Sequence, residues 1–134
     1  MGALPHPGYL CGMASYVLVG EAATGLVLAG TLEHPSFPEA LRVRGPGRWR
    51  WEAGFALQHA TAHASAGDRA ACIGKCAVAI LAEAQARMLE RRERALNEKG
   101  LVERADLSDV EALLAGDRGL ADVVRDVCGA LGLP

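Results

Sequence analysis

The sequence predicts an all-α protein, an up-down bundle of four to five helices built on one long antiparallel hairpin. Alanine, which has the highest helix propensity, dominates the middle of the 134-residue chain, whereas aromatic residues make up only 4% of it. Apolar residues in that region recur at helical spacing. Between two such stretches stands Gly67-Asp68, a glycine that suits a helix end followed by an aspartate that suits a helix start. Because this connection is short, we expect the two helices to pack antiparallel.

The first helix of the hairpin is expected from Trp51 to Ala66. Its larger side chains recur every four residues and therefore share one face. They are Trp51, Phe55, His59 and His63, and Ala53, Ala56, Leu57 and Ala60 stand beside them. We expect Phe55 to lie in the centre of the core.

The second helix is expected from about Asp68 to Leu96, which at the usual rise per residue is about 43 Å. Its apolar stripe consists of Ile73, Ala77, Leu81, Ala84 and Met88. Glu83 with Arg87, and Glu90 with Arg94, are predicted to be exposed pairs one turn apart. Gly100 is expected to end the region.

Two regions are expected along the chain. Residues 1–46 form a lead-in and linker, in which residues 15–32 fit either a helix or a β-hairpin. A short helical turn over residues 38–43 precedes a Gly45-Pro46-Gly47 linker. Residues 47–134 form the helical bundle. Its last helix has a predicted buried stripe of Leu120, Val123, Val124, Val127 and Leu131.

Composition and charge narrow the class of protein. The net charge of −2 gives no overall attraction to nucleic acid or anionic membranes, so we expect neither as a partner. The longest apolar stretch, Tyr16 to Leu32, contains a glutamate and three glycines and is too interrupted for a membrane span. The four cysteines show no disulfide-scaffold spacing. We therefore expect a cytoplasmic protein with reduced thiols.

Several short motifs resemble one family. They are Trp51-Glu52-Ala53-Gly54-Phe55, Gly67-Asp68, Gly74 and Asn97-Glu98-Lys99-Gly100, preceded by Gly12-Met13, Gly30-Thr31-Leu32 and Phe37-Pro38-Glu39-Ala40-Leu41. Together they resemble the C-terminal helical domain of nucleotidyltransferase-domain proteins, a kanamycin-nucleotidyltransferase-like and HEPN-like bundle. The resemblance runs from Tyr9 to about Leu114. It implies a domain that supports substrate binding and forms a homodimer or pairs with a nucleotidyltransferase catalytic domain.

The catalytic motifs of that family do not occur in this chain. Such enzymes carry a Gly-Ser motif followed by paired aspartates that hold magnesium, and no Gly-Ser is found here. The arginine–histidine motif of HEPN ribonucleases is also missing. We therefore expect a non-catalytic domain with no enzymatic activity and no cofactor of its own. The alternatives are a small-ligand enzyme and a purely structural dimerisation module.

The candidate ligand-binding residues are Asn97, Glu98 and Lys99, with Glu52 facing them across the mouth of the hairpin. An amide, a carboxylate and an ammonium placed there could hold a nucleotide or another small-molecule substrate. The alternative is that the triplet merely ends the long helix, where Lys99 complements the negative end of the helix dipole.

No metal is expected, although one set of side chains has zinc-like chemistry. His59 and His63 stand one turn apart on the first helix, and Cys72 and Cys76 stand one turn apart on the second. An antiparallel hairpin could bring them together as a tetrahedral site. The alternative is two packed histidines and two buried thiols.

Overall fold

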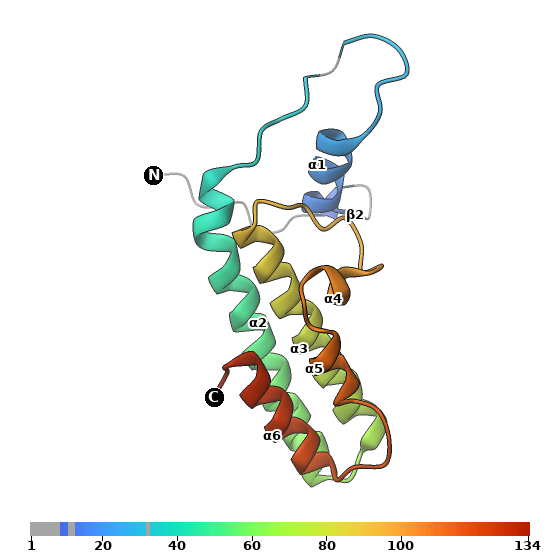
Figure 1. The fold of residues 1–134 in the computed structure, drawn as a ribbon, viewed down its shortest axis with the longest axis vertical. Coiled ribbons are helices and arrows are strands. Elements are labelled where there is room, and N and C mark those ends of the chain that lie inside the picture. The colour runs from blue at the N-terminus through green and yellow to red at the C-terminus, as the bar shows by residue number, and fades with distance from the viewer. Residues whose placement is uncertain (1–8, 11–12, 32) are drawn as a thin grey trace.

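The computed structural model describes residues 9–10, 13–31 and 33–134. Its elements are β1 (Tyr9–Leu10), β2 (Met13–Ala14), α1 (Ser15–Thr24), α2 (Glu39–Ser65), α3 (Arg69–Glu90), α4 (Leu101–Arg104), α5 (Ser108–Ala112) and α6 (Leu120–Leu131). The two short strands pair antiparallel. Figure 1 shows the long α2–α3 pair with the shorter helices packed along it. The all-α bundle built on a long hairpin is therefore confirmed, with six helices in this part of the chain rather than four or five.

The turn between α2 and α3 follows the predicted chemistry. Gly67 has a φ of 72°, a conformation that glycine adopts without steric cost. The N–H of Asp68 donates to the carbonyl of His63, and the N–H of Gly67 donates to that of Ala64, which closes the end of α2. The Asp68 carboxylate then accepts from the N–H of Ala71 at 3.1 Å and caps α3.

The predicted linker at Gly45-Pro46-Gly47 is wrong, because α2 runs through it without a break. Pro46 is buried inside this helix. A Cβ added to Gly45 would lie 2.4 Å from Cδ1 of Leu89, so the backbone of α2 approaches α3 closely here. Tertiary packing thus overrides the local preference of these residues. The predicted boundary between residues 46 and 47 falls inside α2.

The predicted end of the second helix is also wrong. α3 ends at Glu90 and spans 22 residues, or about 33 Å. Arg92 has a φ of 59°, which no helix can continue, and the N–H of Glu93 donates to the carbonyl of Met88. Arg94 therefore lies beyond the helix, where it donates to the carbonyl of Ser36 instead of pairing with Glu90.

The core lies on a different face of α2 from the one expected. Leu57 is 2% exposed and packs toward α3, whereas Phe55 is 48% exposed and Trp51 is 55% exposed. The prediction that Phe55 is central to the core is wrong. Alanines flank Leu57 on the buried face, and small side chains let two helices approach closely, so the bulky rings occupy the opposite side.

The shorter helices cover one side of the hairpin. α6 lies against both α2 and α3, and α4 and α5 pack along α3 (Figure 1). The predicted stripe of α6 is confirmed at Val123, Val124, Val127 and Leu131, which are buried, whereas Leu120 is only partly buried. No described helix has the length and apolar character needed to cross a membrane.

The N-terminal region contains a helix that is shorter than either alternative for residues 15–32. α1 ends at Thr24, and residues 25–31 form neither helix nor strand. Gly20 lies against the side chain of Leu96, which attaches α1 to the loop after α3. Leu26 and Leu28 follow it and are 86% and 88% exposed. This short segment, residues 25–31, is called the leucine segment below.

Candidate functional site

The predicted triplet lies in a loop rather than at the end of a long helix. Asn97, Glu98 and Lys99 are all exposed and stand between the end of α3 and the start of α4. The Asn97 side chain accepts from the N–H of Lys99 at 3.0 Å, and Gly100 follows with a φ of 63°. This is a local turn in which the amide of Asn97 orders the backbone. The alternative interpretation, in which Lys99 complements the dipole of the long helix, is therefore wrong, because α3 ends nine residues earlier.

Glu52 does not lie at the mouth of the hairpin. α2 begins at Glu39, so Glu52 stands more than three turns inside it. Its carboxylate accepts from Arg48 at 2.7 Å. Within the described part of the chain, no hydrogen bond or ion pair joins Glu52 to the triplet. The triplet stays together in its loop, but Glu52 is not joined to it as the sequence predicted.

The four side chains of the possible zinc set do not converge. Cys72 and Cys76 are fully buried between the long helices. His59 is exposed and meets the ring of Phe55 on the outer face of α2. His63 lies 3.8 Å from the Asp68 carboxylate. Over residues 9–10, 13–31 and 33–134, no three residues of the usual ligand types gather in a way that could hold a metal ion.

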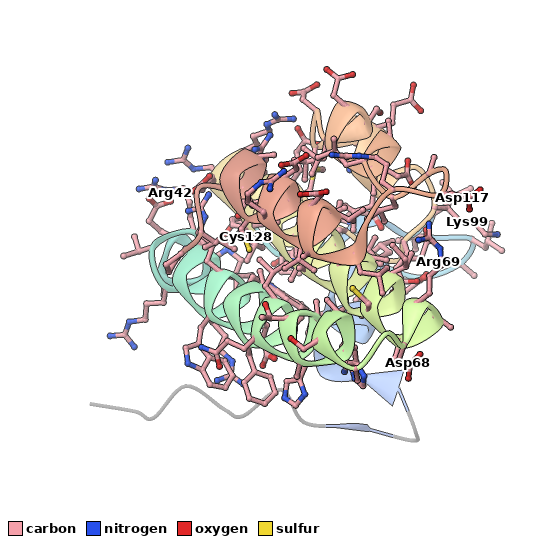
Figure 2. The ribbon with its side chains drawn as sticks, turned by 90° about the horizontal axis from the view of Figure 1, so that it is seen from below. Arg42, Asp68, Arg69, Lys99, Asp117 and Cys128 are labelled. Carbon is pink, nitrogen blue, oxygen red and sulfur yellow. The ribbon has the colours of Figure 1, made fainter. Side chains whose placement is uncertain are left out.

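Burial governs the chemistry of the thiols. Removal from water disfavours the thiolate and raises the pKa of Cys76 to about 12, with the neighbouring Cys72 adding to the effect. Burial likewise raises the pKa of Cys128 on α6. Figure 2 shows Cys128 on the face of α6 that turns toward the hairpin. These thiols have the character of packed core side chains rather than of nucleophiles.

A charge cluster around the buried carboxylate of Glu83 joins the two long helices. Glu83 is only 3% exposed, and both of its oxygens accept from Arg50, at 3.0 and 3.2 Å. Arg50 also donates to both oxygens of Glu90, at 2.6 and 3.1 Å. Arg87 donates to Glu83 from the other side at 3.1 Å. The sequence predicts the Glu83–Arg87 pair, but it predicts an exposed one, and the structure buries it.

The same cluster reaches the segment after α4. Arg87 donates to the carbonyls of Ala105 and Asp106, and Arg91 donates to the carbonyl of Arg104 and to the Asp106 carboxylate. Arg87 and Arg91 therefore bind the segment between α4 and α5 to the end of α3. Every buried polar side chain among the described residues has a partner, so the cluster offers no free group to a ligand. Its role is to hold three segments together.

The charges within the cluster shift each other's titration. Hydrogen bonds from Arg50 hold the pKa of Glu90 below its ordinary value of 4.5. The two carboxylates raise the pKa of Arg50, with the bond to Glu90 contributing most. Both shifts favour the charged pair, which the bidentate geometry already stabilises.

Two hollows on the described surface lie away from the predicted site. One of about 420 Å³ is lined by Arg69, Ala70, Ile73 and Leu114. The other, of about 360 Å³, lies between α2 and α6 and includes Cys128. Figure 2 shows the side chains of Arg69 and Asp68 leaving the start of α3 in different directions. Arg69 donates to the carbonyls of Gly116 and Arg118, so the structure already uses its guanidinium to hold a loop.

Two exposed features emerge instead as candidate interaction surfaces. One is the leucine segment after α1. The other is the row of rings on α2, where Trp51 stacks on Phe55 and Phe55 meets His59. The sequence predicts Phe55 in the core, and it leaves residues 15–32 as either a helix or a β-hairpin. The spacing of the rings identified a shared face, but spacing alone does not say whether that face is inside.

Comparisons with protein-family models, with curated proteins and with solved structures each find no match to this chain. The resemblance to nucleotidyltransferase helical domains therefore remains a hypothesis that rests on the sequence motifs.

Proposed function

We propose that this chain is a non-catalytic helical domain that pairs with a nucleotidyltransferase catalytic domain and contributes to substrate binding there. The motifs that run from Trp51 to Gly100 support the choice of family. The exposed leucine segment is the structural observation that carries the proposal, because it gives such a partner a surface to bind.

The leucine segment has the features of a strand that lacks a sheet. Leu26 and Leu28 alternate with smaller residues and are 86% and 88% exposed. Residues 26–31 donate no backbone hydrogen bond within the described part of the chain. An extended segment of this kind can add to the edge of a sheet, with main-chain hydrogen bonds giving affinity and alternate side chains filling pockets. The resembled catalytic domains contain such a sheet.

The triplet is the part of the domain that we assign to the substrate. Lys99 makes no ion pair with any described residue, and its ammonium is exposed. A free cation on an ordered turn suits the phosphates of a nucleotide or an anionic acceptor. In this proposal the catalytic partner supplies the magnesium site and the reacting groups.

A binding experiment tests the pairing. The full chain is mixed with the nucleotidyltransferase catalytic domain that its native gene or a neighbouring gene encodes, and complex formation is followed by sedimentation velocity. We expect a complex that is lost in the Leu26→Glu, Leu28→Glu double variant. Val43→Glu, a matched change at another exposed apolar residue, should leave the complex intact. Equal binding by both variants, or no complex at all, would contradict the proposal.

Activity measurements test whether the catalytic partner supplies the reacting groups and Lys99 contributes to substrate binding. The chain alone, incubated with magnesium, labelled nucleoside triphosphates and candidate acceptors, should form no adduct. Lys99→Ala should reduce turnover of the reconstituted complex by raising KM, with the melting temperature unchanged. Turnover by the purified chain alone, or full activity of the Lys99→Ala complex, would refute this assignment.

A further inference from the structure

The chain before the leucine segment rests on the loop that follows α3. Gly20, in the middle of α1, is buried, whereas its neighbours Val19 and Glu21 are exposed. A Cβ added to Gly20 would overlap Cδ2 of Leu96 and would lie 3.6 Å from Cγ of that residue. Because glycine has no side chain, α1 can lie directly against Leu96. Figure 1 shows α1 next to the loop that joins α3 to α4.

The chain after the leucine segment is fastened to the same loop, two residues earlier. Arg94 donates to the carbonyl of Ser36 at 3.3 Å, and its guanidinium lies over the ring of Phe37, 5.4 Å from the ring centre. The guanidinium is attracted to the electron-rich face of the ring. Residues 94–96, called the anchor stretch below, therefore hold the chain on both sides of the leucine segment.

A hydrogen bond also joins the two sides to each other. Nδ1 of His34 lies 2.8 Å from the carbonyl oxygen of Ala23. A carbonyl can only accept, so the ring nitrogen carries the hydrogen and donates it. The leucine segment is thus part of a loop that is closed at its base. Closing a loop in advance lowers the conformational entropy that is lost when a partner binds it.

The triplet that we assign to the substrate begins directly after the anchor stretch. Ala95, the middle residue of the stretch, is 6% exposed and belongs to the hydrophobic core, so the bundle holds the stretch in place. Asn97 follows Leu96 and forms the turn that orders the backbone of Lys99. The proposed partner-binding surface and the proposed substrate cation are therefore attached to one support.

We propose that the anchor stretch fixes the leucine segment relative to Lys99, so that a catalytic domain bound to the segment places the phosphates of its substrate against that lysine. This inference rests on the function proposed above, and it adds Gly20, Arg94 and Leu96 as positioning residues. The three residues act by placing the two surfaces and make no contact with the substrate. Turnover is sensitive to such placement, because a displacement of about 1 Å at a reacting group can lower the rate by a large factor.

NMR relaxation of the backbone amides of the full chain tests the shared support without a partner. Gly20→Ala displaces the side chain of Leu96, so the order parameters of the leucine segment and of residues 97–99 should fall together, by roughly 0.1 or more. Arg94→Ala, which releases the other side of the segment, should act in the same direction. Gly54→Ala is the matched control, because a Cβ there meets nothing within 4 Å and both order parameters should stay unchanged. A fall that is confined to the leucine segment would overturn the inference.

Leu96→Val in the Gly20→Ala chain provides a rescue. Valine lacks the Cδ2 atom that the new methyl group would strike, and it keeps a carbon at the Cγ position, where 3.6 Å is an ordinary van der Waals contact. The order parameters of both segments should therefore return toward the values of the parent chain. No recovery would show that the overlap with Leu96 is not the cause, and would overturn the role of this contact.

The reconstituted complex tests the consequence for turnover. Gly20→Ala keeps Leu26 and Leu28, so sedimentation velocity should still show the complex with the catalytic domain. The KM for the magnesium nucleoside triphosphate should rise about threefold or more, with a smaller change in kcat. Adding Lys99→Ala to Gly20→Ala should raise KM little further, because both changes remove the same contact.

The two proposals can fail separately. A parent chain that forms no complex would overturn the proposed function, and this inference with it. A complex in which Gly20→Ala leaves KM unchanged would overturn the positioning role alone. Effects of Gly20→Ala and Lys99→Ala that multiply would do the same, because they would show that α1 and Lys99 act independently.

Discussion

Glu83 is the charged side chain that lies deepest among the described residues, and it depends on two arginines from different directions. Arg50 reaches it from α2 with two hydrogen bonds, and Arg87 reaches it from its own helix with one. Taking a carboxylate out of water costs several kcal/mol unless partners replace the lost hydration. The site therefore fixes how α2 and α3 are placed along each other, since only one register brings Arg50 to Glu83.

Replacing Arg50 with alanine should show how much the free energy of unfolding falls when the buried Glu83 loses one of its partners. Removal of one partner from a buried pair costs about 3–5 kcal/mol when the remaining charge has no other partner. Arg87 stays in place, so we expect a smaller loss of about 1–3 kcal/mol in the free energy of unfolding, measured by urea denaturation. Arg48→Ala removes the exposed pair with Glu52 and should cost less than about 1 kcal/mol. Equal losses in the two variants would show that the burial of Glu83 has no energetic consequence.

Glu90 gives the same cluster a dependence on acid. Its pKa is lowered in the folded protein by Arg50, so its contribution to stability is present above the ordinary value of 4.5 and is lost as the pH falls through the lowered value. We expect Glu90→Gln to be less stable than the parent protein near neutral pH, by up to about 1 kcal/mol because the group is half exposed. The difference should shrink below about pH 4. A difference that persists unchanged at low pH would mean that the carboxylate charge does not matter.

At the scale of elements, α2 buries the face that carries mostly small side chains and exposes the face that carries the aromatic rings. Leu57→Ala should cost about 2–5 kcal/mol, because the side chain is 2% exposed among close-packed alanines. Phe55→Ala should cost less than about 1 kcal/mol in the monomer, because about half of the side chain is already in water. Thermal unfolding of the two variants compares these losses. A larger loss for Phe55→Ala than for Leu57→Ala would mean that the aromatic face of α2 is the buried one.

The hairpin and its turn follow from local chemistry and could be predicted from the sequence. Gly67 and Asp68 act on their immediate neighbours, and the stripe of α6 follows from spacing alone. The buried face of α2 could not be predicted, since Leu57 and Phe55 are both apolar and only the closeness of α3 chooses between them. The helical state of the Gly45-Pro46-Gly47 stretch likewise depends on packing, since Gly45 lies against Leu89, far along the chain on α3.

The predicted placement of the triplet opposite Glu52 is wrong for a related reason. Asn97, Glu98 and Lys99 were expected opposite Glu52 because one helix was assumed to end after them and the other to begin just before it. Arg92 ends α3 early, in a conformation that its residue type does not announce. Because α2 begins earlier and α3 ends earlier than predicted, Glu52 and the triplet do not stand at paired helix ends.

At the scale of the whole molecule, the two cysteines between the long helices report on global unfolding. Cys72 and Cys76 are 0% exposed, and the pKa of Cys76, raised to about 12, further suppresses its reaction as thiolate. We expect a thiol reagent under native conditions to modify both only through opening of the α2–α3 pair. The free energy obtained from the labelling rate should therefore equal that from denaturant unfolding.

Cys128 provides the internal comparison, because it lies on α6 and is partly exposed. It should react faster than the other two, as followed by mass spectrometry of the digested protein. Rapid modification of Cys72 in the folded state would mean that the hairpin opens locally without unfolding.

Pro46 has a mechanical consequence for the molecule. It cannot donate a main-chain hydrogen bond, so the carbonyl of Arg42 lacks the helical partner that every ordinary residue would supply. A pull on the N-terminal end of the chain reaches α2 at Glu39 and unwinds its first turns one hydrogen bond at a time. The missing bond removes one of the links that hold those turns to the rest of the helix. We therefore expect the first turns of α2 to detach at Pro46 before the remainder of the helix, which Arg50 and Leu57 hold against α3.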